Sequence, residues 1–174
     1  EVMSTAHAHP CYLSIFANMG MELDLPITPA TAAISGRISV APYRNPGSNE
    51  LADSVAPYVQ DYNLVLLANH GPIAWGKSPQ EAFFILEDAE AYAKMALIHK
   101  FIVGTYRPIT KQQIQLLADT HDLVINPKRL VNAPDTTTNE EPASSLDAYD
   151  GMAVRLSDET IEKLAEKLAQ KLKS

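Results

Sequence analysis

Residues 63–75 read NLVLLANHGPIAW and predict a β-hairpin. Asn63–Ala68 is a continuous apolar run of strand length, and Pro72–Trp75 supplies the returning strand. The Asn-His-Gly between them is good turn chemistry, because glycine adopts a positive φ without steric cost. Gly71 is therefore free to take a positive φ, and we expect His70 to lie exposed in the connection.

A second histidine-bearing stretch lies near the start of the chain, where Val2–His9 predicts a strand. Side chains at alternate strand positions point the same way, so His7 and His9 would lie about 6–7 Å apart on one face. A third imidazole from His70 would complete the donor set of catalytic zinc sites, which keep one coordination position open. The alternative is that the pair lies on a solvated strand face and that His70 is only a turn residue.

The distribution of histidines favours the metal interpretation. Three of the five histidines in the chain fall in these two stretches. His99 lies near the end of a long predicted helix and His121 lies in a polar stretch, so neither is needed for a site. We therefore predict a divalent metal bound by His7, His9 and His70.

The composition is that of a soluble globular protein. Its 174 residues favour one domain, with 46% hydrophobic and 20% charged residues. No run approaches the roughly 18 apolar residues of a membrane span, and residues 1–5 lack the features of a signal peptide. The net charge of −7 argues against nucleic acid as the main partner. The single cysteine, Cys11, fits a reducing cytoplasm, and we expect a buried structural thiol.

The hairpin is expected to lie among several helices and one more strand. The strand is predicted over 37–42, and helices over about 10–18, 48–60, 79–103 and 110–120. The third of these helices has the strongest start, because Ser78 and Glu81 form a capping box around Pro79 and Gly104 is a natural stop.

This long helix should carry its apolar stripe on Phe84, Glu87, Ala91, Met95 and Ile98. Glu87 is the one acid in the stripe. It could be a partner for an imidazole across the site, but a surface charge is the favoured interpretation, since helical glutamates are seldom buried.

The composition changes after residue 130. Residues 131–156 are polar and contain prolines, which predicts a flexible linker. Residues 157–174 predict an amphipathic helix that is too short to be stable alone and therefore needs a partner surface. That surface could belong to its own domain or oligomer, or to another protein. The apolar stripe of this helix consists of Ile161, Leu164, Leu168 and Leu172.

Four stretches together resemble the class II aldolase/adducin family, and especially its L-fuculose-1-phosphate aldolase branch. The order and the intervals of the stretches match over Glu1 to about Ile102. The interval between the paired histidines and His70 is shorter than in the pentose-phosphate 4-epimerases of the family, which favours an aldolase. The matching stretches are residues 6–10 (AHAHP), 40–43 (VAPY), 47–52 (GSNELA) and 66–71 (LLANHG).

The resemblance implies a three-layer α/β/α fold with a mainly antiparallel central sheet. It also implies a cytoplasmic C4 homotetramer with sites at the subunit interfaces and one Zn²⁺ per subunit, held by His7, His9 and His70. The implied activity is that of a lyase, which cleaves fuculose 1-phosphate, rhamnulose 1-phosphate or a similar sugar to dihydroxyacetone phosphate and an aldehyde such as lactaldehyde. The metal would act as a Lewis acid on the ketose carbonyl.

Several parts of the family pattern have no counterpart in this sequence. The family's acid/base residue and phosphate-binding loops lie upstream of the paired histidines and would precede Glu1, so catalytic residues stay unassigned. Glu1 stands where Met is usual, and a strand follows almost at once, so residues 1–130 are expected to be the C-terminal part of the family domain. The aldolase tyrosine expected near Thr28 and Pro29 is absent.

Two kinds of rival function remain. An epimerase or dehydratase could use the same metal site, and an adducin-like interaction domain would have no activity. The presence of all three histidines counts against the adducin-like domain, whose members lack the metal ligands. By analogy, the linker and terminal helix are similar to the tails that load enzymes into bacterial microcompartments, with a shell protein as partner.

Overall fold

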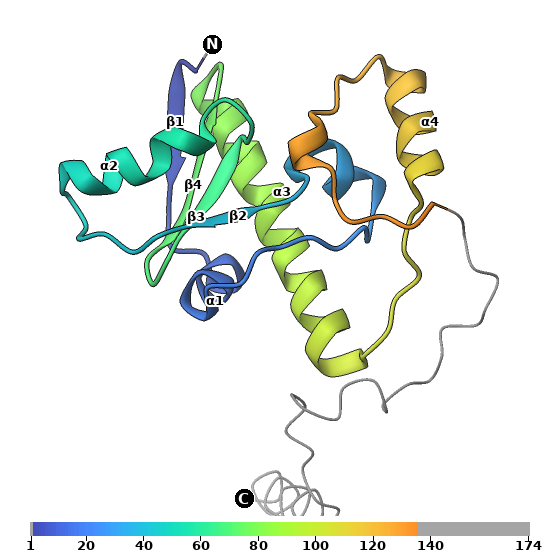
Figure 1. Ribbon diagram of the computed structural model, residues 1–174, viewed down its shortest axis with the longest axis horizontal. Coiled ribbons are helices and arrows are strands. Elements are labelled where there is room, and N and C mark those ends of the chain that lie inside the picture. Colours follow the sequence, from blue (N-terminus) through green and yellow to red (C-terminus); the bar gives the residue numbers. More distant parts are fainter. Residues whose placement is uncertain (1, 136–174) are drawn as a thin grey trace, which may run out of the picture. The chain divides into compact units, whose positions relative to one another are not determined.

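The computed structural model describes residues 2–135, and a four-stranded mixed sheet forms its frame (Figure 1). The order of the strands is β1-β4-β3-β2. Both β1 and β3 pair antiparallel with β4, whereas β2 pairs parallel with β3. The strands are β1 (Ser4–His7), β2 (Ser39–Ala41), β3 (Leu64–Leu67) and β4 (Gly71–Gly76).

The predicted α/β class is therefore confirmed, but the mainly antiparallel sheet is right only in part. Helix α2 (Asn49–Val55) lies in the connection between β2 and β3. A connection of this length carries the chain back along the sheet, so the two strands can run in the same direction. The hairpin of β3 and β4 forms as the sequence predicted.

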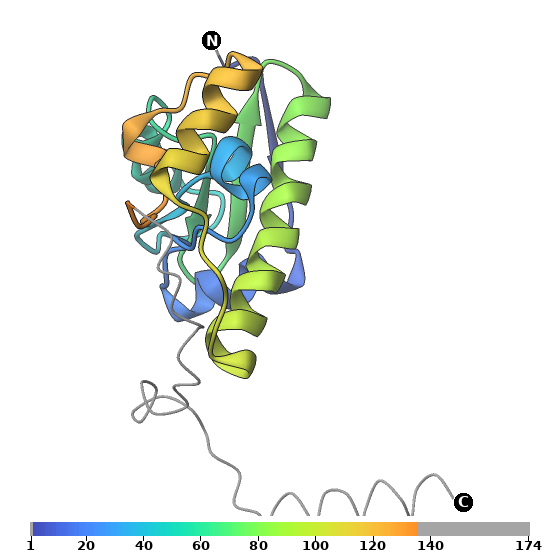
Figure 2. The ribbon, with the colours of Figure 1, turned by 90° about the vertical axis from the view of Figure 1, so that its right-hand side faces the viewer.

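Helices cover both faces of the sheet. On one face, α1 (Cys11–Met19) and α3 (Pro79–Ile98) share a core with Leu64 and Leu66. On the other face, Val65 and Leu67 pack with partly buried side chains of α2 and of the 3-10 turn η2 (Ala56–Tyr58). This arrangement explains why every residue of β3 is apolar and buried. Figure 2, turned by 90°, shows α3 running along one side of the sheet.

The helix starts follow the predicted capping chemistry. The Ser48 hydroxyl accepts from the Leu51 N–H at the start of α2, and the Ser78 hydroxyl accepts from the Glu81 N–H at the start of α3. A π-helical turn, η3 (His99–Val103), extends α3 to Gly104, which has φ 78°. The remaining described elements are η1 (Thr31–Ser35), α4 (Lys111–His121) and η4 (Pro127–Arg129).

The predicted apolar stripe of α3 is wrong. Phe84 is 61% exposed, and Glu87 and Ala91 are exposed as well. The helix instead packs closely against the sheet and α1, because the face that it turns to them is rich in alanine. The larger phenylalanine side chains lie on the opposite, exposed face. Its buried residues are Ala82, Ile85, Leu86, Ala89, Tyr92, Ala93 and Ala96. The favoured surface position of Glu87 is confirmed, whereas Cys11 is exposed and the buried thiol was wrong.

A smaller core joins α4 to the chain that follows it. Val131 and Ala133 are buried with Ala32 and Ile114. The packed part of the chain therefore reaches Ala133, inside the segment predicted as a linker. Residues 136–156 of that linker and the predicted helix at 157–174 lie outside the described residues. No helix in residues 2–135 is long and apolar enough to cross a membrane.

Tyr92 ties α3 to the segment that follows α1, and its loss should be costly. Its buried hydroxyl donates to the Leu25 carbonyl oxygen at 3.0 Å and accepts from the Leu25 N–H at 2.5 Å. Tyr92→Phe leaves the Leu25 N–H unpaired, while the Leu25 carbonyl oxygen keeps its bond from the Ile27 N–H, so we expect the free energy of unfolding to fall by about 1–3 kcal/mol. Tyr43→Phe, at a side chain that is 54% exposed, is the control for urea denaturation. Equal stability of the two variants would contradict this role.

Candidate metal centre

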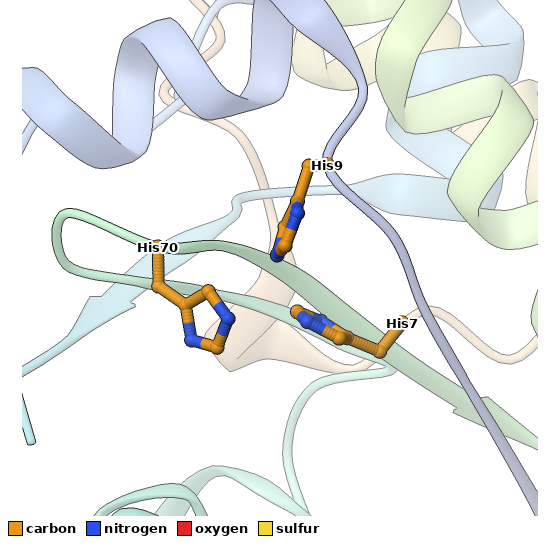
Figure 3. Close-up of side chains that lie close together, drawn as sticks. All are labelled: His7, His9 and His70. Atoms are coloured by element: carbon orange, nitrogen blue, oxygen red, sulfur yellow. The ribbon is translucent and has the colours of Figure 1, made fainter. Parts of the chain in front are cut away.

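Two segments far apart in sequence, residues 7–9 and the turn at His70, bring three imidazoles together (Figure 3). His7 is the last residue of β1, His9 lies between β1 and α1, and His70 lies in the turn between β3 and β4. The ring centroids are 5.0 Å apart for His7 and His9, 4.7 Å for His7 and His70, and 5.0 Å for His9 and His70. One nitrogen from each ring lies within 4.8 Å of the others. The histidines named from the sequence therefore meet at one point.

The pairing of β1 with β4 orients the His7 ring. His7 is opposite Ile73 in the register, so it lies beside the Pro72 carbonyl. The ring Nδ1 lies 2.8 Å from that oxygen, and because a carbonyl can only accept, Nδ1 carries the proton. This bond leaves the lone pair of Nε2 free to bind a metal, as in many histidine ligands held by a backbone carbonyl.

Close backbone contact places His9 beside the turn. A Cβ atom added to Gly71 would lie 2.9 Å from both the Ala8 carbonyl oxygen and His9 Cδ2. Gly71 does not use the positive φ that is open to it, since Asn69 takes the left-handed conformation of this turn, with φ 56°. Asparagine tolerates that conformation well. Glycine is required at position 71 because Ala8 and His9 approach its backbone closely. This requirement cannot be predicted from a turn motif.

The donor set suits a borderline-soft divalent ion such as zinc. Burial, followed by the neighbouring His7 and His9, lowers the pKa of His70, so its ring is neutral near pH 7. Nitrogen ligands lie about 2.0–2.1 Å from zinc, which places two tetrahedral donors about 3.4 Å apart. The three nitrogens lie within 4.8 Å of one another, so each pair would have to close by at most about 1.4 Å to share one ion. The residues therefore fit the metal, while its binding stays a prediction.

The surroundings of the three rings decide access and proton chemistry. His7 and His9 are exposed and His70 is half-buried, so a small molecule can reach the centre from solvent. The Nδ1 atom of His70 is buried and has no hydrogen-bond partner in the described part of the chain. Within residues 2–135, the cluster contains imidazoles alone and no carboxylate. The acid/base residue thus stays unassigned.

The other two histidines lie outside the cluster, as expected from the sequence. The His99 Nδ1 bonds to the Thr105 carbonyl oxygen, and His121 is the last residue of α4. Sequence reasoning missed two features of the site, the Pro72 carbonyl and the close approach at Gly71. A backbone carbonyl leaves no residue-type signal, so only the strand register reveals its role.

Gly71→Ala should displace His9. The new methyl group overlaps Ala8 and the His9 ring, so we expect a loss of about 1–3 kcal/mol in the free energy of unfolding and a shift of the His9 ring NMR signals. Gly47→Ala is the control, because φ is 81° there and no atom lies within 4 Å of the added Cβ. It should cost about 1–2 kcal/mol for the backbone alone and leave the ring signals in place. Unmoved His9 signals in Gly71→Ala would refute the contact.

Known proteins similar to this chain include a decarboxylase and aldolases. The 3-oxo-tetronate 4-phosphate decarboxylase of Escherichia coli (strain K12) is 39% identical over 84 residues, 48% of this chain and 37% of that protein. The 5-deoxy-D-ribulose 1-phosphate aldolase of Bacillus thuringiensis is 33% identical over 119 residues, 68% of this chain and 54% of that protein. A solved L-fuculose 1-phosphate aldolase aligns with a TM-score of 0.62 at 28% identity, over 71% of this chain and 57% of its own.

The chain spans about half the length of the curated relatives that it matches. The family described as the Class II Aldolase and Adducin N-terminal domain matches residues 1–97. This match covers more than half of the 174 residues and includes all three clustered histidines. The chain therefore belongs to the class II aldolase/adducin family.

Proposed function

We propose that this chain carries the metal centre of a lyase that breaks a carbon–carbon bond in a phosphorylated sugar. The observation that supports it most is the convergence of His7 and His9 with the distant His70, with one nitrogen from each within 4.8 Å of the others. An interaction domain has no need of such convergence. One Zn²⁺ per subunit would be held by these three side chains.

The residues around the centre prepare it for a substrate. The Pro72 carbonyl fixes the His7 proton on Nδ1, and the close approach at Gly71 holds His9 beside the turn. The exposed edges of His7 and His9 leave room for a ligand with oxygen donors. When bound, a divalent metal supplies Lewis acidity that stabilises the negative charge developing on a carbonyl oxygen as the neighbouring carbon–carbon bond breaks.

The favoured reaction is aldol cleavage of a ketose 1-phosphate such as fuculose 1-phosphate. Breaking the C3–C4 bond releases an aldehyde, lactaldehyde for a 6-deoxy sugar. The remaining three-carbon fragment becomes dihydroxyacetone phosphate once a proton is added at its carbanionic carbon. Two of the similar proteins reported above act on sugar 1-phosphates by name, which supports this substrate class.

Decarboxylation of a 3-oxo sugar acid phosphate is the second candidate. Loss of CO₂ from 3-oxo-tetronate 4-phosphate leaves the same three-carbon fragment, so both reactions need the same stabilisation. In aldol cleavage the hydroxyl group that becomes the aldehyde oxygen must lose its proton, so a nearby acid/base group is needed. Loss of CO₂ forms no aldehyde and needs no proton transfer at that position. Thr28 and Pro29 stand where the aldolase tyrosine was expected, and the Thr28 hydroxyl hydrogen-bonds to Thr31, which favours decarboxylation.

The other expectations stay proposals that rest on the sequence and on the family. They are an epimerase or dehydratase on the same scaffold, an adducin-like domain without activity, a cytoplasmic C4 homotetramer, and delivery to a microcompartment. The tail that would bind a shell protein lies outside the described residues. The reaction products distinguish an epimerase or dehydratase from a lyase, and the metal content distinguishes an adducin-like domain from a lyase.

Zinc binding is the direct test of the centre. We expect close to one zinc per chain by plasma mass spectrometry after zinc is supplied, and at least a hundredfold lower zinc affinity when His7, His9 or His70 is changed to Ala. His121→Ala is the matched control, since this side chain lies at the end of α4, outside the cluster. No bound zinc in the wild-type chain would end the metal proposal.

Product analysis then identifies the reaction. We expect the zinc-loaded protein, joined to the upstream family segment that carries the acid/base residue and the phosphate-binding loops, to form dihydroxyacetone phosphate, measured with NADH and glycerol-3-phosphate dehydrogenase. Lactaldehyde should form with it from fuculose or rhamnulose 1-phosphate. CO₂ and dihydroxyacetone phosphate from 3-oxo-tetronate 4-phosphate would favour the decarboxylase instead. The variant with all three histidines changed to Ala provides the background. An epimerised or dehydrated sugar without dihydroxyacetone phosphate would exclude both lyase reactions.

A further inference from the structure

Helix α1 starts two residues after His9 and lacks a cap of its own. The N-cap position is Pro10, whose side chain can accept no hydrogen bond, and the described structure gives it none. A helix start normally has its first backbone N–H groups satisfied by an acceptor, most often a Ser, Thr, Asp or Asn side chain. The acceptor for α1 must therefore come from elsewhere in the fold.

That acceptor is Glu90, in the middle of α3. One carboxylate oxygen, Oε1, accepts from the Tyr12 N–H at 2.9 Å, and the other, Oε2, accepts from the Leu13 N–H at 2.8 Å. A carboxylate in this position also complements the positive end of the helix dipole. Glu90 thus joins the start of α1 to α3 with both of its oxygens, across 77 residues or more of sequence.

The buried side of α1 strengthens the same junction. Leu13, Phe16 and Ala17 pack into the core that α3 lines with Ala89 and Ala93, all at most 1% exposed. The small alanines let the two helices approach closely, so a glutamate can reach the first turn of α1. Glu87, one turn earlier on α3, is exposed and makes no such contact with α1.

The last turn of α1 touches the turn that carries His70. The Ala17 carbonyl oxygen accepts from the Asn69 N–H at 3.1 Å. Asn69 precedes His70, and His9 lies two residues before α1 begins. Helix α1 is therefore a spacer of fixed length between the segments that carry His9 and His70. Its position along α3 is set at its start by Glu90.

We propose that Glu90 is a positioning residue for the metal centre, acting through α1 on the spacing of His9 and His70. This inference rests on the proposed metal site. Glu90 is absent from the cluster of possible ligands, so its effect is on geometry and not on the donor set. Loss of its carboxylate frees two N–H groups at the start of α1 and lets the chain just before it, including His9, shift.

The test compares metal binding by Glu90→Ala, Glu90→Gln and Glu87→Ala in the full 174-residue chain. Zinc affinity is measured by competition with a chromophoric chelator, and the visible spectrum of the cobalt-loaded protein reports the ligand geometry. For Glu90→Ala we expect a zinc affinity at least about tenfold lower than that of wild type, and altered cobalt absorption bands. Glu90→Gln keeps one acceptor oxygen and should lie between this variant and wild type, while Glu87→Ala should match wild type.

Thermal unfolding of the metal-free proteins shows which variants are folded at the temperature of the titration. If Glu90→Ala is unfolded there, Glu90→Gln decides. Folded Glu90 variants with wild-type zinc affinity and cobalt spectrum would overturn the positioning role and leave the metal site standing. Absence of zinc binding by the wild-type chain would overturn both.

Discussion

The antiparallel pairing of β1 with β4 is the constraint on which the centre depends. It sets Ser4 opposite Gly76 and His7 opposite Ile73, so one strand register fixes where the first imidazole lies. The same pairing puts the Pro72 carbonyl within reach of the His7 ring. A shift of one residue would turn His7 to the other face of the sheet, because the side-chain period of a strand is two.

The rest of the fold keeps that register in place. β4 lies between β1 and β3, and β3 is buried on both faces by helices that belong to two separate cores. The histidines themselves contribute little to these cores, since two of the three are exposed. A rigid scaffold that holds exposed polar side chains in one geometry is the usual design of a binding or catalytic site.

Much of this architecture could be predicted from local sequence signals. The Ser78 cap, Pro79 and Gly104 defined the long helix, and the apolar run before the turn defined β3, because these features depend on neighbours in the chain. The three clustered histidines could be named for the same reason, since spacing along a strand and a turn motif are local.

Features that depend on distant segments could not be predicted in this way. The buried face of α3 is chosen by the sheet and by α1, so Ala89 and Ala93 are inside while Phe84 is outside. The parallel pairing of β2 with β3 depends on how a crossover packs, and Gly71 is needed because the segment between β1 and α1 passes close to it. Each of these errors reflects a tertiary contact that no window of sequence contains.

The register of β1 also has a consequence for the order of folding. The hairpin of β3 and β4 closes over a few residues, whereas the contact of His7 with Pro72 spans 65 residues. Short loops close faster than long ones, so the hairpin that carries His70 can form before β1 arrives with His7 and His9. The ligand set is then complete only once the chain has largely folded. A metal bound by all three histidines would therefore bind the folded state alone and stabilise it against unfolding.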